Sequence, residues 1–280
     1  MVAQQGEAHV GFNRQTLDVN GVRLNVIVEG QGPDVLLVHG FPDDHTVWRH
    51  QIPALVAAGY RVIAPDTRGN GESSVPPRVA DYDIERLVAD LVGVLDALGV
   101  QKARVVAHDW GSIQGWYLAF RHPERVERYI PLSVGHPQAY RTGGLKQMLK
   151  GYYVGLIQLR GVIEFFVRLF NWLPFRVLLG YASEFPHIKA RLVRPGRLTA
   201  GFNYYRANLR QIFSSESARV QAPVVGIWSD GDRFLTEAQM VNSERFCDGG
   251  WKYVRVEGAN HWLQLDAPAR VNSLLLEHLG

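Results

Sequence analysis

Short apolar runs alternate with helical patterns along most of this chain. The runs are rich in β-branched residues and end at Gly, Asp or Pro, which is typical of strands buried on both faces of a sheet. They lie at residues 34–38, 60–64, 103–107, 223–228 and 252–256. Apolar residues at three- and four-residue steps predict helices over 84–98, 235–246 and 263–279. The alternation predicts an α/β fold, with a mostly parallel twisted sheet and helices on both of its faces.

Two parts of the chain depart from this alternation. Residues 15–19 and 22–29 flank Asn20-Gly21, a strong hairpin signal, so we expect the sheet to begin with an antiparallel pair. Residues 136–215 are rich in Leu, Phe, Tyr and Arg, with helical stretches and no convincing parallel strand. We expect them to form a helical cap over the carboxyl ends of the strands. The predicted domains are residues 1–135 with 216–280, and the cap, 136–215.

Composition excludes several classes of protein. The single cysteine, Cys247, rules out an internal disulfide framework and a multi-cysteine metal site. The ten histidines show no His-x-x-x-His spacing, so no metal is implied. The net charge of +3 is too small to suggest nucleic acid. The amino terminus has no secretory pattern and no apolar run reaches the roughly 18 residues of a membrane span, so we expect a soluble cytoplasmic protein.

The sharpest local motif is Ala107-His108-Asp109-Trp110-Gly111, between a predicted strand and a predicted helix. Small residues two before and two after Asp109 permit a tight strand-to-helix turn that holds its side chain at the helix amino terminus. In this motif the chain resembles the α/β-hydrolase superfamily, in the aspartate-nucleophile branch of epoxide hydrolases and haloalkane dehalogenases. The resemblance extends over essentially the whole chain and implies an α/β-hydrolase fold.

An aspartate at this turn has chemical meaning. A serine that attacks a saturated carbon would give an ether, whereas a carboxylate gives an alkyl ester that activated water can hydrolyse. Asp109 therefore points to a substrate with an electrophilic saturated carbon. The alternative is a structural aspartate that caps the following helix.

Two later motifs match the rest of a catalytic triad. Ser229-Asp230-Gly231-Asp232 follows a predicted strand, where the fold places its acid, and Asp232 matches the family position better than Asp230. Gly258-Ala259-Asn260-His261 follows the last strand, where it places its histidine. The order nucleophile, acid, histidine is that of α/β-hydrolases. His261 would then take a proton from water while Asp232 fixes its tautomer.

The same resemblance implies an oxyanion hole. His39-Gly40-Phe41-Pro42 ends another strand, and the amides of Phe41 and Trp110 would face the oxygen of the tetrahedral intermediate. An ordinary Gly-Pro turn is the alternative. The bond before this proline is often cis in the family, so we expect a cis Phe41-Pro42 bond.

The choice between epoxide and halide depends on side chains near the nucleophile. Most haloalkane dehalogenases place Asn or Trp where this chain has Phe41, which donates no hydrogen bond. Epoxide hydrolases use two cap tyrosines to protonate the alkoxide, and Gly201–Arg206 resembles the segment that carries one of them, at Tyr205. Tyr153 matches the other more loosely, with Tyr152 as a competitor. The chain departs from the family at Asp43-Asp44-His45, which puts the rim of the pocket in doubt.

These motifs predict a cofactor-independent epoxide hydrolase that converts epoxides to vicinal diols through an alkyl ester on Asp109. Its partner would be a small-molecule epoxide, bound among Phe41, Trp110, Tyr153 and Tyr205. A haloalkane or haloacid dehalogenase is the first alternative, and a non-catalytic ligand-binding protein with a hydrolase fold is another. The particular epoxide, the preferred enantiomer and the oligomeric state are not readable from the sequence.

Charge is distributed unevenly between the predicted domains. Residues 136–215 hold 12 Lys and Arg against only Glu164 and Glu184, a formal charge of +10, which leaves −7 on the rest. Solvation of the cap and salt bridges to the acidic domain would account for this. The sharper hypothesis is a basic surface interleaved with aromatic residues that attracts anionic amphiphilic substrates or a membrane surface. These aromatic residues are Phe165, Phe166, Phe170 and Trp172.

Overall fold

The computed structural model describes residues 11–181, 183–212 and 218–280. Eight strands form one sheet in the order β1-β2-β4-β3-β5-β6-β7-β8. The strands are β1 (Arg14–Val19), β2 (Val22–Glu29), β3 (Asp34–Val38), β4 (Arg61–Pro65), β5 (Ala103–His108), β6 (Val126–Leu132), β7 (Val224–Ser229) and β8 (Trp251–Val256). The predicted α/β-hydrolase fold, with its mostly parallel sheet, is confirmed.

The antiparallel part of the sheet lies at its first edge. β1 pairs with β2, and Asn20 and Gly21 between them both have positive φ, of 45° and 75°. This geometry matches a two-residue turn that needs left-handed residues, so the predicted hairpin is confirmed. β2 is also antiparallel to β4, and the pairings from β4 onward are parallel.

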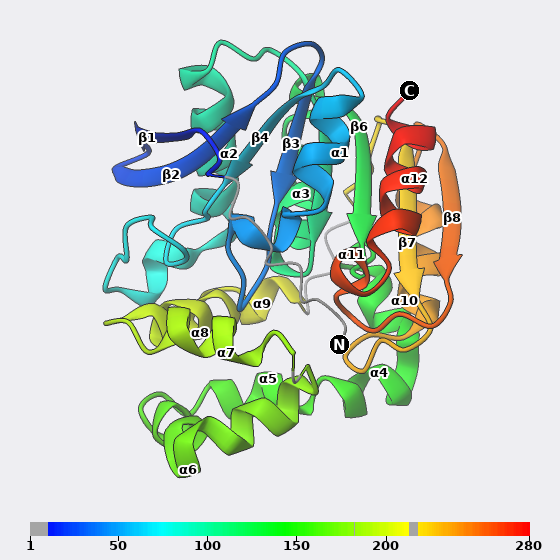
Figure 1. Cartoon of the computed structure of the whole chain (residues 1–280). Helices are drawn as coiled ribbons and strands as arrows, with labels where there is room; N and C mark the ends of the chain where they lie inside the picture. The colour runs from blue at the N-terminus through cyan, green and yellow to red at the C-terminus, as the bar shows by residue number, and fades with distance from the viewer. Residues whose placement is uncertain (1–10, 182, 213–217) are drawn as a thin grey trace, which may run out of the picture.

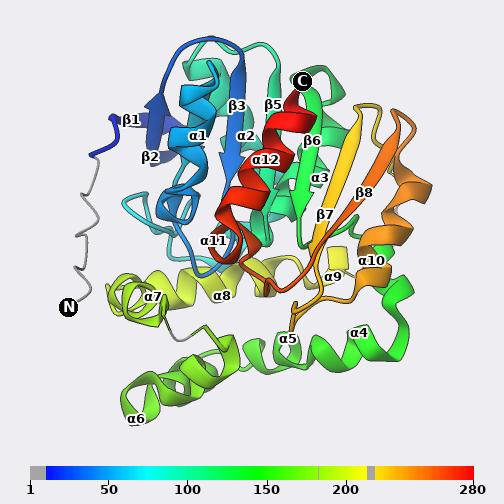
Figure 2. The same cartoon turned by 45° about the vertical axis from the view of Figure 1, so that its right-hand side comes forward.

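Helices cover both faces of the sheet, as Figure 2 shows, with α1 and α12 on one face and α2 and α3 on the other. The helices of this part are α1 (Gln51–Ala57), α2 (Ile84–Ala97), α3 (Trp110–Arg121), α10 (Glu237–Val241), α11 (Leu263–Asp266) and α12 (Pro268–Leu279). Short 3-10 turns lie at His45–Trp48, Val79–Tyr82, Pro123–Arg125 and Asn242–Phe246. A buried ion pair between Arg68 and Asp90, with an N–O distance of 2.5 Å, fixes the loop after β4 to α2.

Three details differ from the sequence-based prediction. β6 was not predicted, because Glu127, Arg128 and Pro131 interrupt its apolar pattern. The helix expected over 235–246 is shorter, since α10 gives way to a 3-10 turn at Asn242. The helix expected over 263–279 is divided into α11 and α12, because Pro268 cannot continue a helix and instead begins one.

The segment between β6 and β7 is helical and lies beyond the carboxyl ends of the strands (Figure 1). Its described residues form a 3-10 turn at Ala139–Gly143 and six helices. These are α4 (Gly144–Lys150), α5 (Tyr152–Ile157), α6 (Val162–Leu179), α7 (Phe185–Leu192), α8 (Arg197–Ala207) and α9 (Leu209–Ile212). We call α4–α9 the inserted helices. In both views α7 and α8 lie next to the sheet and α6 lies farthest from it.

α6 is not continuous. Leu169–Trp172 leave helical geometry, and Phe170, Asn171 and Trp172 have φ of 47°, 58° and 70°. Over the described ranges, no helix has the length and apolar character that a membrane span needs.

Candidate active site

Asp109 sits between β5 and α3 in a strained turn. Its φ of 53° and ψ of −123° are rare for a residue with a side chain. The turn is tight because α3 approaches β3 closely: a Cβ on Gly111 would overlap the carbonyl oxygen of Val38. The small residue expected two positions after Asp109 is therefore required sterically, because a larger side chain would not fit there.

The two carboxylate oxygens of Asp109 have different partners. Oδ1 accepts a hydrogen bond from the backbone N–H of Phe41 at 2.8 Å, and the amide of Trp110 also donates to this carboxylate. Oδ2 lies 3.4 Å from Nε2 of His261. The Phe41-Pro42 bond is cis, as expected from the family resemblance. These contacts favour a reactive carboxylate over a simple helix cap.

His261 is buried and lies between two carboxylates. Its Nδ1 is 2.8 Å from Oδ2 of Asp232, whose Oδ1 accepts hydrogen bonds from the amides of Phe234 and Leu235 at 2.8 and 2.9 Å. Asp230 instead accepts from the amide of Gly258, away from the histidine. Asp232 is thus the carboxylate that contacts His261, as the motif predicted.

The charges around His261 set its protonation. Burial lowers its pKa, but the carboxylates of Asp232 and Asp109 outweigh this and raise the pKa to about 10. The same pairing lowers the pKa of Asp109. Burial would raise its pKa, yet the hydrogen bond from His261 leaves the pKa below its ordinary value. In the resting protein, Asp109 is therefore an anion beside an imidazolium.

Two buried side chains form hydrogen bonds with the backbone of His261. Its carbonyl oxygen accepts hydrogen bonds from Oγ of Ser133 at 2.9 Å and from Nε2 of His108 at 2.8 Å. Burial lowers the pKa of His108 to about 3, so this imidazole is neutral and donates through Nε2. The role of His108 could not be read from the motif that contains it.

Two tyrosines from the inserted helices lie across from Asp109. Tyr205 (α8) and Tyr153 (α5) have ring centroids 6.0 Å apart, and Tyr205 packs edge-on against Trp110 at 5.0 Å. Burial raises the pKa of both hydroxyls well above 10, so both carry their protons at neutral pH. Tyr152 also lines the larger cavity, but it is 59% exposed, whereas Tyr153 packs against Tyr205, so the geometry favours Tyr153 over its neighbour.

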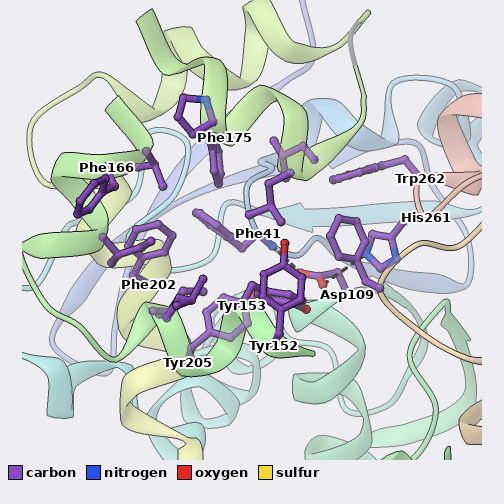
Figure 3. Close-up of a pocket in the computed structure, with 18 residues that line it drawn as sticks. Phe41, Asp109, Tyr152, Tyr153, Phe166, Phe175, Phe202, Tyr205, His261 and Trp262 are labelled. Atoms are coloured by element: carbon purple, nitrogen blue, oxygen red, sulfur yellow. Dashed lines mark hydrogen bonds and ion pairs between the residues drawn. The ribbon is translucent and has the colours of Figure 1, made fainter. Parts of the chain in front are cut away.

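Two cavities meet at these residues. The larger, of about 210 Å³, has apolar walls that include Phe41, Phe175 and Phe202 (Figure 3). The smaller, of about 70 Å³, lies toward Trp110. Five residues line both cavities: Asp109, Tyr153, Tyr205, Phe234 and His261. A ligand that filled both cavities would therefore place its middle atoms between Asp109 and the tyrosines.

One polar contact that joins the inserted helices to this site was not predicted. Asp43, buried after the cis-proline, accepts a hydrogen bond from the indole of Trp262 at 2.8 Å and lies 3.3 Å from the guanidinium of Arg191 in α7. Burial raises the pKa of Asp43 to about 7, although Arg191 and Trp262 oppose this shift. The only signal in the sequence was the departure from the family pattern at Asp43-Asp44, because Arg191 is 148 residues away.

The chain is similar to known proteins over nearly its whole length. A family model described as alpha/beta hydrolase fold matches residues 33–158. The chain is 35% identical to the AB hydrolase superfamily protein YfhM of Bacillus subtilis, across 96% of this chain and 98% of the relative. It is 33% identical to epoxide hydrolase A of Mycobacterium tuberculosis, across 94% and 96%.

Solved structures agree with these relatives. The crystal structure of epoxide hydrolase A from Mycobacterium thermoresistibile superposes with a TM-score of 0.80 at 32% identity, over 95% of this chain and 98% of the other. The epoxide hydrolase of Bacillus megaterium, in complex with an inhibitor, superposes with a TM-score of 0.85 at 26% identity, over 95% and 99%. This chain therefore belongs to the α/β-hydrolase superfamily and, within it, to the epoxide hydrolases.

Proposed function

We propose that this protein hydrolyses epoxides to vicinal diols through a covalent ester on Asp109. The observation that carries the proposal is the placement of Tyr153 and Tyr205 where the two cavities meet, opposite Asp109. A carboxylate, two protonated phenols and an apolar cavity are what opening an epoxide requires. The residues 136–215 act in this proposal as a cap that supplies the phenols.

In the first step, Oδ2 of Asp109 attacks an epoxide carbon. The carbon–oxygen bond of the ring breaks, and the hydroxyl of Tyr205 or Tyr153 gives its proton to the leaving oxygen, which becomes an alcohol. The products of this step are an alkyl ester and a tyrosinate. Oδ2 is the oxygen suited to attack, because Oδ1 already accepts a hydrogen bond from the backbone amide of Phe41.

Forming the ester changes His261. The ester is neutral, so His261 loses one of the two carboxylates that raise its pKa. Its proton then restores the tyrosine, and the neutral imidazole can accept a proton from water. Through Nδ1, Asp232 keeps the imidazole in the required orientation.

In the second step, the activated water attacks Cγ of Asp109. Negative charge develops on Oδ1, where the amides of Phe41 and Trp110 stabilise it. The bond between Cγ and Oδ2 breaks, the diol leaves with Oδ2, and the proton of the new carboxyl group passes to the diol. The balance is one epoxide and one water consumed for each diol.

The shapes of the cavities define the proposed substrate class. The walls of the larger cavity are mainly aliphatic and aromatic, with Ile157, Val167 and Phe175 from the inserted helices. We propose an apolar epoxide with its larger substituent in this cavity and a smaller one toward Trp110. The cytoplasmic location and absence of cofactor stay predictions.

Trapping the ester tests the proposed function. The His261→Gln variant should form the ester and fail to hydrolyse it, so mass spectrometry should show the intact mass of the epoxide added to the Asp109 peptide. Asp230→Asn, which alters a carboxylate outside the triad, should turn over without accumulating the adduct. Absence of any adduct across terminal, aryl and fatty-acid epoxides, or halide release from bromoalkanes at higher efficiency, would contradict the proposal.

A further inference from the structure

The outermost inserted helices, α4–α6, expose many large apolar side chains. Along α4, α5 and the residues just after α5 they recur at three- and four-residue steps at Leu145, Leu149, Tyr152, Leu156 and Leu159, each between 45% and 71% exposed. Within each helix this spacing places the pair, Leu145 with Leu149 and Tyr152 with Leu156, on one face. We call the exposed surface of residues 144–177 the outer face.

The outer face continues onto α6 with aromatic residues. Phe165 and Phe166 are 62% and 53% exposed, and Phe170, where α6 is interrupted, is 78% exposed. Both views place α6 at the margin of the molecule, away from the sheet. Monomeric soluble proteins rarely expose a contiguous apolar surface of more than a few hundred Å², so a surface of this kind calls for a partner.

The charged side chains exposed on the outer face are cationic, and one of them, Arg168, stacks over the ring of Trp172. Lys146, Arg160, Arg168 and Arg176 are exposed, and none of them forms a salt bridge with another described residue. The only acidic residue in 144–181 is Glu164, which is buried and paired with Arg206 at 2.8 Å. The outer face therefore lacks negative charge of its own.

The basic residues of α7 and of the loop between α7 and α8 behave differently. Arg191 contacts Asp43 and Asp44, and Arg194 pairs with Glu72 at 2.6 Å. Salt bridges to the acidic domain thus account for positive charge on the side of the inserted helices that faces the sheet. They do not account for the cations of α4–α6.

We propose that the outer face binds the surface of an anionic lipid bilayer. The apolar side chains would enter the boundary between headgroups and acyl chains, and the cations without a salt bridge would meet lipid phosphates. A second copy of the chain fits less well, because two outer faces in contact would bring their unpaired cations together. Binding at the surface also agrees with the finding that no described helix could span the bilayer.

The outer face is continuous with the larger cavity. Tyr152, Leu156 and Phe166 are exposed on this face and also line the cavity. A docked protein would therefore present the wall of its cavity to the bilayer, where apolar epoxides accumulate. This last consequence rests on the proposed function, whereas the binding of lipid does not.

Vesicle sedimentation of the full chain tests the binding directly. The protein should sediment with vesicles of equal parts phosphatidylglycerol and phosphatidylcholine, and not with phosphatidylcholine alone. Each cation near an anionic surface contributes about a fivefold factor in binding, so Arg168→Gln with Arg176→Gln should weaken it roughly thirtyfold. Phe165→Ser with Phe170→Ser should abolish it. The matched control, Lys102→Gln with Arg23→Gln, removes two exposed charges from the sheet domain and should bind normally.

Circular dichroism and turnover of a water-soluble epoxide would establish that the variants fold. None of the four altered residues of the outer face lines a cavity. Equal binding by the Arg168/Arg176 variant and the control would overturn the proposal, as would no sedimentation of the unaltered protein with anionic vesicles. A dimer that dissociates in the Phe165/Phe170 variant, without vesicle binding, would assign the outer face to a second copy instead.

Discussion

Replacing Asp109 by asparagine imitates the charge of the ester intermediate without a substrate. The side chain keeps nearly the same shape and loses its negative charge, which lies 3.4 Å from Nε2 of His261. With an effective dielectric constant of about 20, this interaction is worth about 5 kcal/mol. Since 1.36 kcal/mol corresponds to a tenfold change in a protonation equilibrium, the pKa of His261 should fall from about 10 to roughly 6.4.

Titration of the His261 imidazole by nitrogen-15 NMR measures this directly. Asp109→Asn should titrate near neutrality, while Asp230→Asn, which removes a carboxylate outside the triad, should keep the high pKa. Stability should follow: the raised pKa stabilises the fold fully below the ordinary pKa of histidine, about 6.5, and this contribution is lost as the pH rises toward 10. A pKa that stays high in Asp109→Asn would refute the idea that ester formation switches His261 into a base.

Three further outcomes follow from the contacts of the site and the core. Tyr205→Phe should slow ester formation by about a hundredfold, measured by stopped-flow tryptophan fluorescence, while Tyr152→Phe should leave it nearly unchanged; equal losses would contradict the assignment. With enzyme in excess in oxygen-18 water, the first diol should carry no label because its new oxygen comes from Asp109, and mass spectrometry of a labelled first product would exclude the ester route. Asp90→Asn breaks the buried ion pair described above and should lower the free energy of unfolding by about 3–5 kcal/mol in urea titrations. Glu72→Gln, in an exposed pair, should cost less than about 1 kcal/mol, and similar losses would argue against burial as the cause.

The order of elements along the chain was largely predictable, because buried parallel strands are apolar and end at turns. β6 was the exception. Its Glu127 is partly solvated and pairs with Arg104 at 2.8 Å at the amino end of the sheet, so the strand tolerates charge there. Pro131 is also unusual in a central strand. Such local compensation comes from neighbouring strands and is not visible in the strand itself.

The site divides in a similar way. Asp109, Asp232 and His261 follow strands, where the fold brings side chains to one edge, so motif and chain order were enough to bring them together. The hydrogen bond between Trp262 and Asp43 joins residues 219 positions apart, and no local sequence pattern predicts it. The same holds for the two cavities, because their walls combine loops of the sheet with helices whose packing the sequence does not specify.

The inserted helices leave the sheet after β6 and return at β7, and these two strands are neighbours. The whole segment therefore begins and ends at nearly one place, so its length and content could change without altering the order of any strand. In the proposed mechanism, the loops of the sheet carry the nucleophile and the water-activating pair, whereas the segment carries Tyr153 and Tyr205. A chain with the same sheet and a different insertion would keep a reactive carboxylate and lose its acid. In this architecture, the inserted segment would determine which bond of the substrate is broken. The loops of the sheet would determine how the ester is hydrolysed, and the two could change independently.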